Sequence, residues 1–162
     1  ESLEVHLLIA GDGELSEKLR SAINNYGIET KVTMLGALGQ KQLADLHRIS
    51  SAFVLTSVFE GLPLTVLEAL ACGTPVVSTN CGETPKFLSA ESGIICEQRT
   101  PEAIASAIEQ ILRNPHQYPT SACTQTAKPY EARTVVNQVY RNMLNVWEER
   151  INSHHYPLFH QQ

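Results

Sequence analysis

Residues 52–78 read AFVLTSVFEGLPLTVLEALACGTPVVS, in which two short apolar runs flank a longer segment. The runs cover residues 52–56 and 75–78, and each has the length of one buried strand. The segment between them contains Pro63, which suits the first turn of a helix, and closes at Gly73, the residue type that most often follows a helix end. A strand, a helix and a strand in succession predict a parallel β–α–β unit.

The same alternation extends to both sides of this unit. Apolar runs outside it predict strands at residues 5–10, 31–35 and 93–96. Apolar side chains at helical spacing predict helices at residues 15–26, 43–49, 84–88, 100–112 and 132–151. Because short strands alternate strictly with helices, we expect an α/β fold, namely a doubly wound parallel sheet with a C-terminal helix. Residues 114–130 are polar and contain prolines, so we expect an irregular link there.

The composition is typical of a globular chain and argues against several classes of partner. Of the 162 residues, 43% are hydrophobic and 18% are charged, which suits one folded domain. The net charge is −5 and no basic run is present, so nucleic-acid binding is not expected. No apolar run approaches the roughly 20 residues that cross a bilayer. The four cysteines form no CxxC pair, so we expect reduced thiols and no metal site.

Two glutamates, Glu60 and Glu68, interrupt the otherwise apolar or small residues of this central segment. Burying a carboxylate without a partner costs several kcal/mol, so their presence needs a reason. Glu60 directly follows a predicted strand, where ligands of parallel sheets bind. Gly61 removes a side chain at a point where another group can approach the backbone.

A helix that begins near Leu62 or Pro63 would leave the backbone N–H groups of Leu64 and Thr65 free. Such free N–H groups and the helix dipole form an anion site. Glu68 lies about 7.5 Å further along the helix axis, within reach of a sugar hydroxyl. This combination suits a nucleotide sugar. The spacing is equally compatible with an exposed helical Glu68 and with a Glu60 that only favours the helix dipole.

The ordered motifs resemble those of the retaining glycosyltransferases with two facing Rossmann-like domains, often called family 4 or group 1. The hallmark of that family is a pair of glutamates separated by seven residues and followed by a small-residue and Pro-Val-Val run, which here spans residues 60–77. Three further segments match in order: LIAGDG at 8–13, MLG at 34–36 and CGETP at 81–85. In the last of these, Glu83 replaces a common second glycine. The resemblance covers about residues 5–113 and, less distinctly, the last helix.

The resemblance implies a role for each matching residue. Glu68 would bind the ribose hydroxyls of a nucleotide-sugar donor, and Glu60, the candidate catalytic residue, would orient the donor sugar. Backbone N–H groups would hold the phosphates, and the base would pack near the loop after the MLG segment. The remaining expected donor-binding residues are Gly61, Leu62, Leu64 and Thr65 for the phosphates, Gly36, Ala37 and Leu38 near the base, and Gly11 and Gly13 in the first glycine turn.

The resemblance also implies a domain plan and a reaction. Residues 1–130 would form a donor-binding domain truncated at its N-terminus, residues 131–151 a C-terminal helix and residues 152–162 a tail. The acceptor-binding domain, a strand and helix of the sheet, and a "GRL…KG" segment that neutralises the diphosphate would precede Glu1. The full-length enzyme would transfer a hexosyl group from a nucleotide-diphosphate sugar with retention, without a metal or cofactor.

Further expectations concern the setting of this chain. The resemblance suggests glycan or polysaccharide biosynthesis and a cytoplasmic location, peripheral to the inner face of the membrane. The isolated chain would bind nucleotide weakly without turning over. The C-terminal helix, uncovered, would promote self-association through its apolar face.

Three other functions are weighed against this one. A dinucleotide-binding oxidoreductase would need a third glycine after residues 11–16 and an acid at the end of the next strand, and both are missing. A nucleotide-sugar epimerase of the same architecture shares the donor-type site and stays open. A non-catalytic nucleotide-binding module also stays open, although only Asp12 supplies an aspartate at a strand end. His47 and Lys86 are interpreted as surface residues.

Overall fold

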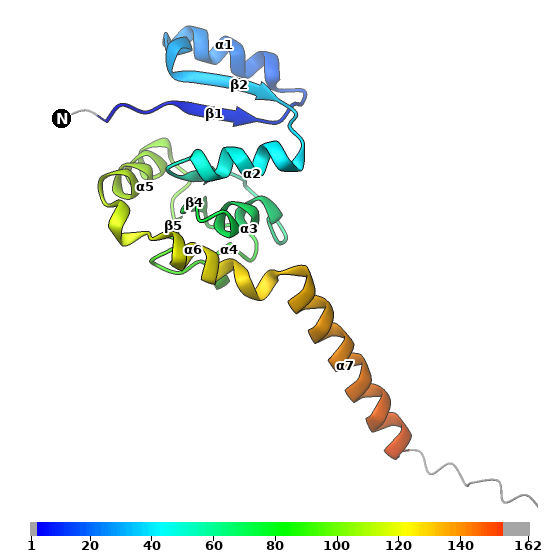
Figure 1. The fold of residues 1–162 in the computed structure, drawn as a ribbon. Helices are drawn as coiled ribbons and strands as arrows, with labels where there is room; N and C mark the ends of the chain where they lie inside the picture. The colour runs from blue at the N-terminus through cyan, green and yellow to red at the C-terminus, as the bar shows by residue number, and fades with distance from the viewer. Residues whose placement is uncertain (1–2, 154–162) are drawn as a thin grey trace, which may run out of the picture.

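A computed structural model describes residues 3–153, in which strands and helices alternate along the chain (Figure 1). The strands are β1 (Leu7–Ala10), β2 (Val32–Gly36), β3 (Phe53–Leu55), β4 (Val76–Thr79) and β5 (Gly93–Cys96). The α-helices are α1 (Ser16–Tyr26), α2 (Gln40–Ile49), α3 (Leu64–Ala71), α4 (Thr84–Phe87), α5 (Pro101–Arg113), α6 (Thr120–Ala127) and α7 (Ala132–Ser153). Short 3-10 turns are η1 (Glu29–Lys31), η2 (Pro115–Gln117) and η3 (Lys128–Tyr130). The predicted tail lies outside the described residues from residue 154 onward.

All strand pairs are parallel, so the expected α/β fold class with parallel strands and a C-terminal helix is confirmed. The strands nevertheless form two sheets: β1 pairs with β2, and β3, β4 and β5 follow one another in a second sheet. In the common doubly wound order 3-2-1-4-5-6, these sheets correspond to strands 3-2 and 4-5-6. No described strand occupies the central position between β1 and β3.

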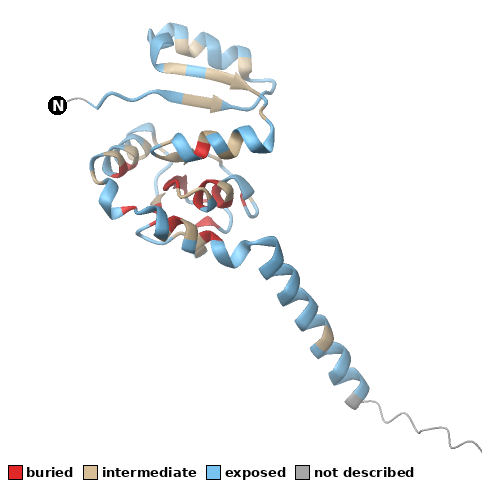
Figure 2. Ribbon diagram, in the orientation of Figure 1, coloured by how far each residue is buried: buried red, intermediate tan, exposed pale blue. Residues whose placement is uncertain are grey.

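The hydrophobic core lies on the two faces of the β3–β5 sheet. One face packs against α3 and α6 and the other against α5. Buried side chains concentrate in this part of the molecule, whereas β1, α1 and β2 contain none (Figure 2). The first cluster contains Val66, Ala69, Leu70, Val76, Cys123 and Ala127. The second contains Val77, Cys96, Ala107, Ile111 and Tyr118.

Helix α6 corrects the prediction of an irregular link over residues 114–130. Its sequence, TSACTQTA, has few strong helix formers, and prolines stand before it. The helix exists because Cys123 and Ala127, four residues apart, are buried against α3. Tertiary packing therefore overrides the weak local preference.

His47 also departs from expectation, because it is 7% exposed rather than a surface residue. Its ring meets Phe53 edge-on, with ring centroids 5.2 Å apart. Burial lowers the pKa of His47, and the nearby charge of Glu68 opposes that shift. The residue thus joins α2 to the strand that leads into the predicted site.

Helix α7 projects away from the body of the molecule (Figures 1 and 2). It begins at Ala132, as predicted, and continues two residues beyond the expected end. Most of its large apolar side chains are exposed, and they include Val136, Val139, Tyr140, Met143, Val146 and Trp147. Among residues 3–153, this helix and all others fall short of the length and apolar character that crossing a membrane requires.

Candidate functional site

The segment that joins β3 to α3 carries the first of the two predicted acids. The hydroxyl of Ser57 donates to Oε1 of Glu60 at 2.7 Å, and the Glu60 side chain is half-buried. Pro63 is buried and holds an extended conformation just before Leu64, where the helix begins. The helix therefore starts one or two residues later than predicted, and Glu60 lies four residues before it.

The start of α3 leaves backbone donors available, as the sequence predicts. The N–H of Val66 donates to the Pro63 carbonyl at 3.1 Å. The N–H groups of Leu64 and Thr65 have no acceptor among the described residues. Both residues are exposed, so these donors face solvent. An anion at this end of the helix would meet two free N–H groups and the positive end of the dipole.

The loop that carries Glu60 is fastened to the end of β4 and to the loop after it. The Thr79 hydroxyl donates to the Ser57 carbonyl at 2.6 Å, and the N–H of Glu83 donates to the Gly61 carbonyl at 2.9 Å. Gly82 has a φ of 58°, and its backbone packs closely against the backbone of residues 60 and 61. Glu83 also binds Lys86 at 2.8 Å on the exposed surface, as expected for that lysine.

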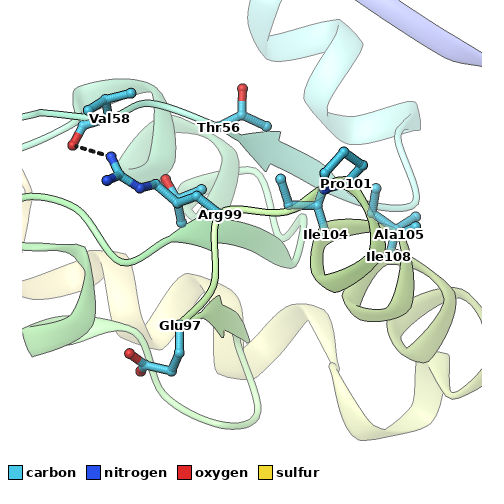
Figure 3. A pocket seen from close by; sticks show the side chains of 9 residues that line it. Thr56, Val58, Glu97, Arg99, Pro101, Ile104, Ala105 and Ile108 are labelled. Atoms are coloured by element: carbon cyan, nitrogen blue, oxygen red, sulfur yellow. Dashed lines mark hydrogen bonds between the residues drawn. The ribbon is translucent and has the colours of Figure 1, made fainter.

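Arg99 reaches the same loop from the segment between β5 and α5. Its guanidinium donates to the Val58 carbonyl at 3.3 Å (Figure 3). Beside this contact lies an open hollow of about 1080 Å³, with Ile104, Ala105 and Ile108 of α5 on one wall. Neither Glu60 nor Glu68 lines this hollow. The two predicted acids therefore lie outside this hollow.

Glu68 lies in the middle of α3 and is half-buried. Helix α2 packs against α3, and the charge of Glu68 is close enough to act on the pKa of His47. The two predicted acids thus share one strand–helix unit: Glu60 precedes the helix and Glu68 lies within it.

The glycines predicted to contact the donor meet at the ends of β1 and β2. The N–H of Gly11 donates to the Gly36 carbonyl at 2.7 Å, and both residues have positive φ values of 124° and 66°. Asp12 accepts hydrogen bonds from the Ser16 hydroxyl and the Gly13 N–H, both at 2.8 Å. These two contacts, the Ser16 bond foremost, lower the pKa of Asp12.

The predicted site residues thus form two groups on two sheets. Gly11 and Gly36 bond directly, with Ala37 and Leu38 in the loop that follows, whereas Glu60 and Glu68 belong to the β3–α3 unit. No hydrogen bond among residues 3–153 joins the two groups. Helix α2 connects them, because it follows the glycine loop and packs on α3.

The contacts of four residues around the Glu60 loop were not predicted from the sequence: Ser57, Thr79, Gly82 and Arg99. Gly82 belongs to the matching segment at 81–85, but its contact with the Glu60 loop was not predicted. Ser57 carried no distinguishing signal, since serine is a common residue in the loop after a strand. The contacts of the other three span more than twenty residues of sequence, and only the fold brings them to this loop. Within the described part of the chain, no cluster of three or more His, Cys, Asp or Glu side chains could hold a metal ion.

Comparison with known proteins places the chain among glycosyltransferases. A family model described as "Glycosyl transferases group 1" matches residues 1–128. An uncharacterized glycosyltransferase of Methanocaldococcus jannaschii is 44% identical over 80 residues, which are 49% of this chain and 19% of that protein. The lipopolysaccharide 1,6-galactosyltransferase of Salmonella typhimurium is 34% identical over 112 residues, which are 68% of this chain and 31% of that protein.

A solved structure supports the same fold. Anabaena HepE in complex with UDP-glucose superposes with a TM-score of 0.75 at 20% identity, over 90% of this chain and 42% of that one. This likeness shows the fold alone, that of a Rossmann-like half of a GT-B glycosyltransferase. The chain spans about a third or less of the length of the curated relatives named above.

Proposed function

We propose a function that starts from the family: this chain belongs to the glycosyl transferases group 1 family. It acts as the donor-binding half of a retaining glycosyltransferase of the family 4 type. The full-length enzyme transfers a hexosyl group from a nucleotide-diphosphate sugar to an acceptor. Because the chain spans only part of the length of its relatives, acceptor binding belongs to a further domain of the same protein.

One observation carries the proposal: two acids flank a helix start whose backbone donors are free. The N–H groups of Leu64 and Thr65 lack acceptors among the described residues, and Glu60 precedes them on a fastened loop. Glu68 follows on the same helix. A diphosphate needs donors without a carboxylate in contact, whereas sugar and ribose hydroxyls need carboxylate acceptors. The β3–α3 unit offers both.

Each residue then has a stated role. The carboxylate of Glu68 accepts from the ribose hydroxyls, and that of Glu60 accepts from hydroxyls of the donor sugar and orients it. The backbone at Gly61, Leu62, Leu64 and Thr65 lies along the diphosphate. The base lies against Gly36, Ala37 and Leu38, beside the turn formed by Gly11 and Gly13.

Transfer proceeds without a metal ion or cofactor in this proposal. The leaving diphosphate is stabilised by the helix dipole, by backbone N–H groups and by basic side chains of the complete protein. A chelator therefore leaves nucleotide binding unchanged, and a requirement for a divalent cation would contradict this part of the proposal.

The printed names of two relatives support the proposed donor class and the proposed role in biosynthesis. HepE is solved with UDP-glucose, so UDP and its sugars are the first probes. The Salmonella relative is named for lipopolysaccharide, which supports a role in glycan or polysaccharide biosynthesis. We place that role in the cytoplasm, at the inner face of the membrane.

The test is a calorimetric titration of the chain with UDP, GDP, ADP and their sugars. Weak, saturable binding of one nucleotide is expected, and E68A lowers its affinity about tenfold or more, since hydrogen bonds to a carboxylate are worth about 1.5–3 kcal/mol each. The matched control is E102A, which removes an exposed acid from the first turn of α5.

Two outcomes would count against the proposal. Absence of binding by this chain and by the full-length protein would refute the donor site. Interconversion of nucleotide sugars by the full-length protein without an acceptor would favour the epimerase instead. Efficient transfer by the isolated chain would contradict only the expectation that it does not turn over.

A further inference from the structure

We propose that Ser57 and Thr79 are positioning residues that fix the Glu60 carboxylate and thereby set the preference for a nucleotide sugar over the bare nucleotide. The inference rests on the proposed function, because it assigns the hydroxyls of the donor sugar to Glu60. It concerns how the Glu60 carboxylate is held. Two hydrogen bonds in series, from the Thr79 hydroxyl to the Ser57 carbonyl and from the Ser57 hydroxyl to the Glu60 carboxylate, form what is called the relay below.

The relay begins at the end of β4. Thr79 is 1% exposed, and its hydroxyl donates to the Ser57 carbonyl at 2.6 Å. All four residues of β4 are buried, so its backbone is fixed by the core on both faces. The Thr79 hydroxyl therefore holds the main chain of residue 57 at a constant position relative to the sheet.

The second step joins Ser57 to the acid. Its hydroxyl donates to Oε1 of Glu60 at 2.7 Å, a charge-assisted bond when the carboxylate is ionised. No described group donates to Oε2 of Glu60. One carboxylate oxygen is thus held by the protein, and the other is available to a ligand hydroxyl.

The main chain around Glu60 is also held by contacts on either side of that residue. Arg99 holds the Val58 carbonyl, and the N–H of Glu83 holds the Gly61 carbonyl. The remaining freedom of Glu60 lies in its side-chain torsions, which the Ser57 hydroxyl restricts. Without that hydroxyl, the Glu60 side chain becomes ordered only when the sugar binds, and the lost side-chain entropy weakens the affinity for the sugar nucleotide. Diphosphate and base contacts do not involve Glu60, so nucleotide binding is unaffected.

A control is available in the segment that leads into β4. Thr74 is 2% exposed, and its hydroxyl donates to the main-chain carbonyl of His47 at 2.6 Å, the same geometry as Thr79 with Ser57. T74V and T79V each delete one buried hydroxyl that donates to a main-chain carbonyl. The His47 carbonyl keeps the Ser50 N–H at 3.0 Å, so T74V is the milder change in stability, and only T79V acts on the Glu60 loop.

The experiment measures the dissociation constants of UDP and UDP-glucose for the chain, with GDP and GDP-mannose or ADP and ADP-glucose as the pair if UDP does not bind. S57A lowers the preference for the sugar nucleotide about two- to tenfold and leaves the bare nucleotide unchanged. T79V acts in the same direction, T74V leaves the ratio unchanged, and S57T restores it. The double variant S57A/T79V loses no more than S57A, because both act on one relay.

The outcomes separate the two claims. Nucleotide binding with an unchanged ratio in S57A overturns the positioning role and leaves the proposed function standing. No binding of any nucleotide overturns both the proposed function and the preference. A readout without ligand tests the relay itself: the ¹³C resonance of the Glu60 carboxyl shifts in S57A and T79V and not in T74V. An unchanged resonance in both variants overturns the relay.

Discussion

Gly82 lies so close to Gly61 that a Cβ atom at residue 82 would overlap the Gly61 carbonyl oxygen and lie 2.8 Å from that of Glu60. The backbone of Gly82 is also left-handed, with a φ of 58°. The loop after β4 and the loop that carries the candidate acid are therefore in direct backbone contact. This contact depends on the absence of a side chain at one residue.

Replacing Gly82 by alanine is expected to lower the free energy of unfolding by about 2 kcal/mol or more, because left-handed strain adds to the overlap. It also weakens sugar-nucleotide binding by displacing the Glu60 loop. Urea unfolding and calorimetric titration measure the two effects. G39A is the control, since its φ is −75° and its Cβ meets only Gln42 Oε1 at 3.5 Å. Equal stability of the two variants would contradict the prediction.

His47 predicts a pH dependence of stability. Burial lowers its pKa below the ordinary value of 6.5. The unfolded chain therefore takes up the proton first, so the stability contribution is complete above about pH 6.5 and is lost as the pH falls toward the folded pKa. Urea unfolding at several pH values between 7.5 and 5 measures the slope.

Two variants isolate this residue. H47L removes the titrating group, so the slope in this range becomes shallower, whereas H116Q, at an exposed histidine, leaves it unchanged. E68Q removes the charge that opposes the shift and makes the slope steeper. An identical slope in H47L and the parent chain would refute the assignment.

The four cysteines are expected to differ in reactivity. Cys72 is half-exposed, whereas Cys81, Cys96 and Cys123 are buried. Burial raises the pKa of Cys123 to about 11, which leaves little thiolate at neutral pH. Ellman's reagent at pH 8 therefore modifies one thiol rapidly and the others only on unfolding. C72S abolishes the rapid phase, and a rapid phase that persists in C72S would contradict the prediction.

The exposed apolar face of α7 is expected to make the chain self-associate as its concentration rises. Sedimentation equilibrium measures the mass, and V139D/M143D returns it to that of a monomer because two charges replace two apolar side chains of the face. Q138D, on the opposite side of the helix, is the matched control. A parent chain that stays monomeric at high concentration would show that the face is not self-complementary.

The strands and most helices could be predicted because their signals are local. Apolar runs such as Val76 and Val77 identify β4, and Thr100 caps α5 by accepting from the Ala103 N–H, as its sequence suggests. Helix α6 could not be predicted, because its stability comes from contacts of Cys123 and Ala127 with α3. The division into two sheets is likewise a matter of pairing between distant strands, which periodicity does not report.

The residues of the candidate site also differ in how well the sequence predicts them. Glu60 and Glu68 stand out in the sequence because acids are unusual within an apolar segment, and their functional roles stay predictions. Ser57 and Thr79 carry no such signal, since serine and threonine are common near strand ends. Their importance comes from a hydrogen bond between residues 22 positions apart in the sequence. A hydrogen bond of this kind follows from the fold and from the side-chain rotamers together.

The gap between β1 and β3 has a consequence for cooperativity. The β1–β2 sheet contains no buried residue, while both core clusters belong to the β3–β5 part. We expect the first part to open by sub-global unfolding well below the temperature at which the second part melts. Amide hydrogens of β1 and β2 should then exchange before those of β4, and the calorimetric enthalpy should exceed the van't Hoff enthalpy. A single unfolding free energy for this chain would describe the β3–β5 part alone.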